Sequence, residues 1–233
     1  ALLASAYKGT GQIAQALAAL IGSQSPGDMP ELAELYDLSG KPYAGLKPLL
    51  EGLQRASGTE KIDIYCSLRN LEMRLGFYRE ALEHAELAVN LSRDIAGIHH
   101  MIRSLQARGR TFLVLGRWQE AEADFSTAAD LCRDNALSMK RPVQVDLFDL
   151  QLRMGHIQQA QTTLADLEDK ISHGGVPAKQ MLLMLKASMG VHLGRGEKAL
   201  PEALARYLYK RSHGMELSLC TVYVQSGILY IQS

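Results

Sequence analysis

The chain has 233 residues, of which 47% are hydrophobic and 6% aromatic, and its 25 basic residues balance its 25 acidic ones. A net charge of zero argues against a sequence-independent phosphate binder, which needs a basic surplus to release counterions, and against a polybasic membrane-surface protein. Abundant alanine and leucine with few aromatics favour helices over a β-rich domain.

The first quarter of the chain predicts two short helical hairpins. The first spans residues 1–22 and turns at 9–11, and the second spans residues 29–56 and turns at 39–42. Gly9-Thr10-Gly11-Gln12-Ile13-Ala14 also matches the loose dinucleotide-binding fingerprint, but residues 2–8 lack the β-strand that this fingerprint requires. A turn between two helices is the better interpretation, and no stretch alternates with the period of a strand.

Four glycines then recur at spacings of 40, 39 and 39 residues, and each is followed five positions later by an alanine. The glycines are Gly76, Gly116, Gly155 and Gly194, and the alanines are Ala81, Ala121, Ala160 and Ala199. Glycine lets the backbone turn tightly between helices, and alanine lets the two helices approach closely. The pattern predicts hairpins at 60–93, 98–133, 138–172 and 177–211, with Thr59 as the N-cap of the first.

A final helix is expected at 215–233, which would make residues 1–233 a single helical-repeat array. The segment Leu217–Ser233 is too short and too polar for a confident membrane span, and its apolar residues need a cover. We expect it to be an exposed edge through which the chain self-associates, and we expect the chain to be part of a longer protein.

The turn segments Leu75-Gly76-Phe77-Tyr78-Arg79-Glu80-Ala81 and Leu115-Gly116-Arg117-Trp118-Gln119-Glu120-Ala121 resemble the tetratricopeptide repeat (TPR). The resemblance covers residues 62–133 well and 134–171 less closely. The sequence departs from the family in its longer period, in the missing helix-ending proline, and in Arg69 and Phe148, which replace a small first-helix residue kept at Gly109. Longer repeats of this kind look like the sensor regions of bacterial signal-transduction ATPase regulators.

The resemblance implies an all-α, right-handed superhelical array in which the first helix of each hairpin lines a concave groove that holds a protein or peptide segment. The side chains expected to face this groove and to bind there are Asn70, Arg74, Arg103, Gln106, Arg110, Asp149 and Met184. Arginine suits a carboxylate or a peptide backbone because its planar fork donates two hydrogen bonds at once. The alternative interpretation is that Arg103 and Arg110 pair with Asp146, Asp149 or Glu72 on neighbouring helices.

Neither a catalytic nor a metal-binding pattern appears in the sequence. His99 and His100 are consecutive, so a helix would point them about 100° apart. Cys66, Cys132 and Cys220 are too far apart for a zinc or redox motif, and we expect reduced, buried thiols. We therefore expect no enzyme, no cofactor, no metal, and no direct binding of nucleic acid or membrane.

The sequence thus favours a protein- or peptide-binding scaffold in the cytoplasm, serving as the interaction or ligand-sensing region of a larger bacterial transcriptional or signalling regulator. A small effector is an alternative ligand. Two alternative functions are an accessory domain that positions the substrate of a multidomain enzyme, and a freestanding assembly scaffold.

Overall fold

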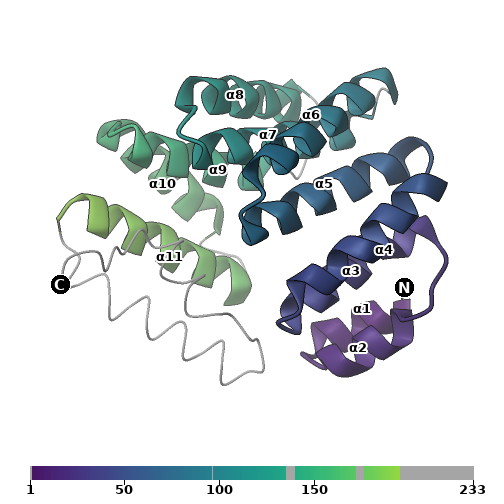
Figure 1. Cartoon of the computed structure of the whole chain (residues 1–233). Helices are drawn as coiled ribbons and strands as arrows, with labels where there is room; N and C mark the ends of the chain where they lie inside the picture. Colours follow the sequence, from purple (N-terminus) through teal and green to yellow (C-terminus); the bar gives the residue numbers. More distant parts are fainter. Residues whose placement is uncertain (1, 96, 135–139, 172–175, 195–233) are drawn as a thin grey trace. The chain divides into compact units, whose positions relative to one another are not determined.

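The structure is a computed structural model that describes residues 2–95, 97–134, 140–171 and 176–194 (Figure 1). Every regular element in these ranges is a helix, and consecutive helices form hairpins, so the expected all-α array of hairpins is confirmed. The chain divides into two compact units, residues 1–146 and 147–233. None of the described helices is both long and apolar enough to cross a membrane.

The α-helices, in chain order, are α1 (Leu2–Gly9), α2 (Ile13–Leu20), α3 (Met29–Leu38), α4 (Pro42–Arg55), α5 (Gly58–Leu75), α6 (Tyr78–Ile95), α7 (Ile98–Val114), α8 (Trp118–Asp134), α9 (Lys140–Arg153), α10 (Ile157–Ile171) and α11 (Val176–His192). A short 3-10 turn, Pro26–Asp28, precedes α3. The expected second half of the hairpin at 177–211 and the final helix at 215–233 lie outside the described residues.

Glycines with a left-handed backbone make the hairpin turns. The φ angles are +84° at Gly76 and +74° at both Gly116 and Gly155. Gly11 and Gly40 have the same conformation, each with φ of +77°. Side chains other than glycine rarely adopt this region, so these residues end one helix and redirect the chain into the next. The turn interpretation of residues 9–14 is therefore confirmed, because α1 precedes Gly11 and α2 follows it.

Replacing Gly76 with alanine is expected to lower the free energy of unfolding by about 1 kcal/mol, because a β-carbon disfavours positive φ. A Cβ at this position would meet nothing within 4 Å, so the backbone conformation is the only penalty. Urea denaturation followed by circular dichroism measures the loss. The Gly76→Asn variant is the control, since asparagine tolerates this region and should lose less stability. Equal stability of the alanine variant and the wild type would contradict this.

The alanines five residues after the turn glycines are buried between helices. Ala81, Ala121 and Ala160 are each 0% exposed, as expected, while Ala199 lies outside the described residues. In the first unit the partners of each hairpin pack together, α1 with α2, α3 with α4, α5 with α6 and α7 with α8. Figure 1 shows these helices as successive antiparallel pairs. First helices also contact one another, α3 with α5 and α5 with α7.

The expected N-cap of α5 is wrong. The helix begins at Gly58, and its N-cap is Ser57 instead of Thr59. The backbone N–H of Ser57 donates to Oε2 of Glu60 at 3.3 Å, which is one half of a capping box. Glu60 stands three positions after Ser57, and this spacing identifies the true start of the helix.

Candidate binding groove

A pocket of about 520 Å³ opens on the first unit. Its lining residues are Ser5, Lys8, Gly27, Pro30, Glu31, Ala33, Glu34, Asp37, Asp63, Ser67, Asn70, Leu71, Arg74 and Arg103. Apart from Gly27 in the 3-10 turn, all of them lie on α1, α3, α5 or α7, the first helices of four successive hairpins. The volume lies in the range of sites that hold small ligands or a few side chains.

The lining residues share a register relative to the turn glycines. Ser5 and Lys8 stand six and three positions before Gly11, and Glu34 and Asp37 stand at the same offsets before Gly40. The repeat therefore presents one face of each first helix to the pocket.

The same rule holds for the longer repeats. Asp63 and Arg103 both stand thirteen positions before their glycines, Gly76 and Gly116, and Asn70 stands six before Gly76. The groove face expected from the sequence begins only at α5. Extending the offsets to Gly11 and Gly40 adds Ser5, Lys8, Glu34 and Asp37 to it.

Each cation in the pocket is already paired with a carboxylate of the pocket. Nζ of Lys8 lies 2.5 Å from Oε2 of Glu34, and Nη1 of Arg74 lies 2.5 Å from Oδ2 of Asp37. The third pair joins two first helices, with Nη1 of Arg103 donating to Oδ1 of Asp63 at 2.5 Å. Such partly exposed pairs contribute little to stability, so their side chains can exchange partners at low cost.

Asp37 is the most deeply buried acid of these pairs. Its side chain is 12% exposed, and its Oδ1 is buried with no hydrogen-bond donor. Burial raises the pKa of Asp37, because desolvation disfavours the charged form, and the nearby Arg74 only partly offsets this. Oδ2 of Asp37 therefore carries the contact with Arg74, while Oδ1 is shielded from solvent.

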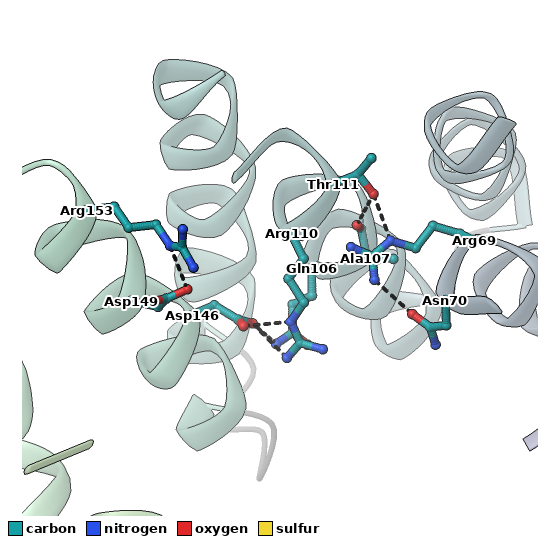
Figure 2. Close-up of polar contacts among 9 residues, drawn as sticks. All are labelled: Arg69, Asn70, Gln106, Ala107, Arg110, Thr111, Asp146, Asp149 and Arg153. Carbon is teal, nitrogen blue, oxygen red and sulfur yellow. Dashed lines mark hydrogen bonds and ion pairs between the residues drawn. The ribbon is translucent and has the colours of Figure 1, made fainter. Parts of the chain in front are cut away.

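Gln106 and Arg110 were expected to bind a ligand, but both donate hydrogen bonds to Asp146 on α9 (Figure 2). Nε and Nη2 of Arg110 donate to the two carboxylate oxygens at 2.6 and 3.0 Å, and Nε2 of Gln106 donates to Oδ2 at 2.6 Å. Asp146 and Gln106 are buried. The three side chains thus link α7 to α9, and the pair of Arg110 with Asp146 is the internal pairing expected as the alternative to ligand binding.

Arg69 is a buried guanidinium with neutral hydrogen-bond partners. Its Nε donates to Oγ1 of Thr111 on α7 at 2.7 Å, and its Nη1 donates to Oδ1 of Asn70 at 2.8 Å (Figure 2). Thr111 in turn donates to the carbonyl oxygen of Ala107 at 2.9 Å. Burial, with a smaller contribution from the charge of Arg110, lowers the pKa of Arg69 to about 10, so the group remains charged at pH 7.

Three of the seven expected site residues line the pocket, namely Asn70, Arg74 and Arg103. Asp149 lies in the second unit, where its Oδ2 accepts a hydrogen bond from Nε of Arg153 at 3.2 Å. The backbone of Met184 belongs to α11, and its side chain lies outside the described residues. The use of these seven side chains in binding stays a prediction.

The cysteines offer no metal site within the described part of the chain. Cys66 and Cys132 are buried, and Cys220 lies outside the described residues. Burial raises the pKa of the Cys66 thiol, which disfavours the reactive thiolate. Over the same described ranges, no three His, Cys, Asp or Glu side chains are grouped so that they could hold a metal ion.

No family model and no curated protein matches the sequence. Among solved structures, the apo form of RapI is similar with a TM-score of 0.65 and 13% identity over 93% of this chain and 83% of that one. A Rap protein complexed with Competence and Sporulation Factor has a TM-score of 0.60 and 15% identity over 93% of this chain and 67% of its own. A tetratricopeptide repeat protein from Parabacteroides merdae has a TM-score of 0.59 and 14% identity over 96% of this chain and 94% of its own. At these identities the likeness shows the fold, which is that of TPR-like helical repeat proteins.

Proposed function

We propose that this chain is a protein- or peptide-binding scaffold whose binding surface is the pocket on α1, α3, α5 and α7. The observation that carries the proposal is that first helices of four successive hairpins converge on one cavity of about 520 Å³ lined mainly by polar side chains. A surface built by stacking repeats suits an extended segment, because each hairpin presents the same face to it. The similar Rap protein solved with Competence and Sporulation Factor supports a peptide or protein as the partner.

In this proposal the chain is the interaction or ligand-sensing region of a larger bacterial transcriptional or signalling regulator, and it works in the cytoplasm without catalysing a reaction. A small effector is the alternative ligand, and self-association through Leu217–Ser233 remains part of the proposal. The second candidate, an accessory domain that positions the substrate of an enzyme, is favoured by the same cavity. A catalytic domain next to this chain in the full-length protein would distinguish it from the first.

The proposal is tested by selecting peptides from a random display library on the purified chain and measuring their affinity by fluorescence anisotropy. We expect the double variant Asn70→Ala/Arg103→Ala to bind selected peptides at least tenfold more weakly, because both side chains line the pocket. Arg103 is 46% exposed in its side chain, so its loss should leave the fold intact. Arg110 is not substituted, because its removal would leave the buried Asp146 with an uncompensated charge.

The matched control is Arg79→Ala/Arg117→Ala. These two arginines are exposed near the starts of second helices, where each pairs with a nearby glutamate, and neither lines the pocket. The control should bind like the wild type. Selected peptides that bind the pocket variant and the wild type equally would refute the pocket as the binding surface.

A further inference from the structure

One face of α5 runs along the pocket and carries a neutral amide between two ion pairs. The pocket residues on this face are spaced by four, three and four positions, which places them in one row along the helix, and they are Asp63, Ser67, Asn70 and Arg74. Arg103 pairs with Asp63 toward one end of the row, and Asp37 pairs with Arg74 toward the other. All three cations that line the pocket are paired with its own acids, so the amide of Asn70 is left as a neutral donor between them.

The orientation of the Asn70 amide is set by Arg69. Nη1 of Arg69 donates to Oδ1 of Asn70 at 2.8 Å. A guanidinium has donors only, so the amide oxygen must face it and the NH2 group must point the other way. Figure 2 shows the amide nitrogen of Asn70 turned away from the guanidinium. Arg69 is buried, whereas Asn70 is exposed and lines the pocket, so the NH2 group lies on the pocket side.

This NH2 group is a free donor, and the group that orients it is itself held in place. No hydrogen bond among the described residues uses the amide nitrogen of Asn70. Nε of Arg69 donates to Oγ1 of Thr111 on α7 at 2.7 Å, and both side chains are buried, which confines the guanidinium. Its charge polarises the amide that it contacts and makes the NH2 group a stronger donor. Since burial of this charge without an ion pair costs stability, the fold alone does not explain Arg69.

We propose that Arg69 is a positioning residue for binding, which holds the Asn70 amide so that the pocket selects a main-chain carbonyl oxygen of the bound segment. An extended peptide offers this acceptor at every residue. A neutral acceptor suits the pocket because a carboxylate would first have to displace one of the acids that pair with its cations. A donor that is fixed in advance also avoids the cost of ordering a side chain on binding. The inference rests on the proposed function and adds the chemistry of the partner.

The first test measures the affinity of library-selected peptides for the wild type, Arg69→Met, Asn70→Ala and the double variant, by fluorescence anisotropy on the whole chain. Methionine fills similar space but cannot donate to Asn70. We expect Arg69→Met alone to weaken binding about threefold, because the peptide must then order the Asn70 amide. In the Asn70→Ala background the same substitution should have no effect. A role of Arg69 in packing alone would weaken binding equally in both backgrounds.

The matched control is Thr111→Ser. It removes a buried methyl group between α5 and α7 but keeps the hydroxyl that anchors Arg69, so it should bind like the wild type. The free protein provides a spectroscopic readout. The ¹⁵N relaxation of the Asn70 side-chain NH2 group should report a rigid group in the wild type and in Thr111→Ser, and a mobile group in Arg69→Met.

The second test identifies the acceptor in the peptide. Replacing one main-chain amide of a selected peptide with an ester leaves a carbonyl that accepts hydrogen bonds more weakly. At one position of the peptide this replacement should weaken binding to the wild type about threefold, the effect of one neutral hydrogen bond. The same analogue should bind Asn70→Ala as tightly as the unmodified peptide does.

Three results would overturn the inference: wild-type affinity in Arg69→Met, an equal loss in both backgrounds, or no ester position whose effect depends on Asn70. If selected peptides still require Asn70 and Arg103 in any of these cases, the proposed function stands and only the selection of a carbonyl through Arg69 fails. If selected peptides do not require the pocket, both proposals fail together.

Discussion

The Gly109→Ala variant is expected to be less stable than the wild type by about 1–3 kcal/mol, although alanine normally favours a helix interior by about 1 kcal/mol over glycine. The reason is a close approach to the neighbouring helix. A Cβ at Gly109 on α7 would lie 2.6 Å from Cε1 and 2.9 Å from Cδ1 of Phe125 on α8. Phe125 is 0% exposed, so its ring is confined and cannot withdraw without moving the helices apart.

A double-mutant cycle isolates this contact. Phe125→Leu alone should be destabilising because it leaves unfilled space, whereas Gly109→Ala/Phe125→Leu should lose less than the sum of the two single variants. Chemical denaturation of all four proteins gives the coupling energy. Gly9→Ala is the control, since a Cβ there meets nothing within 4 Å. Additive losses in the cycle, or a neutral Gly109→Ala variant, would show that the hairpin tolerates a wider separation.

The preceding repeat has a large and a small residue at the same two positions, but in the opposite order. Forty residues before Gly109 and Phe125 stand Arg69 and Ala85, so here the large side chain is on the first helix and the small one on the second. Arg69 is buried, and Ala85 is 0% exposed. The departure from the family pattern at Arg69 therefore accompanies a smaller residue on the facing position, because the space inside each hairpin is limited.

Replacing Arg69 with methionine is expected to raise the free energy of unfolding by about 1–3 kcal/mol. Arg69 is 6% exposed, and its hydrogen bonds go to the neutral side chains of Thr111 and Asn70. A buried charge with neutral partners loses solvation without a matching ion pair. The unbranched side chain of methionine fills similar space.

The methionine variant should leave no buried polar group unsatisfied. Thr111 keeps its hydrogen bond to the carbonyl oxygen of Ala107, and the exposed Asn70 can bond to water. Arg69→Lys is the control, because it retains the charge but loses the forked donor, and it should be less stable than the wild type. Thermal and urea unfolding measure both variants. A methionine variant less stable than the lysine variant would mean that the positive charge itself stabilises the fold.

The pH dependence of this difference provides a second readout. The pKa of Arg69 is lowered to about 10 in the folded protein, well below its ordinary value in the unfolded chain. Above pH 10 the folded protein releases this proton while the unfolded chain still holds it, so the contribution of Arg69 to stability rises with pH. The advantage of the methionine variant over the wild type should therefore shrink by about 1 kcal/mol from pH 7 to pH 11. An advantage that does not change with pH would contradict the lowered pKa.

Repeat spacing predicted more of the pocket than residue type did. The offsets from the turn glycines place Asn70 and Arg103 on the right face. The same offsets from Gly11 and Gly40 identify Ser5 and Lys8 on α1 and Glu34 and Asp37 on α3, which residue type alone did not single out. Residue type suggested an arginine patch for a carboxylate and, as the alternative, pairing of Arg103 and Arg110 with acids on neighbouring helices. Neither interpretation named Asp63 as a partner, although it stands 40 residues before Arg103 and pairs with it.

The sequence by itself determined where the hairpins turn and which residues face inward. The positive φ at Gly76 and the close packing at Ala81 depend on residues nearby in the chain. The spacing of glycine and alanine along the sequence therefore predicts both. Only the tertiary structure decided which charged side chains pair with one another. Gln106 and Asp146 are 40 residues apart, and whether they meet depends on how hairpins stack. Asp37 and Arg74, 37 residues apart, likewise pair only because α3 packs against α5.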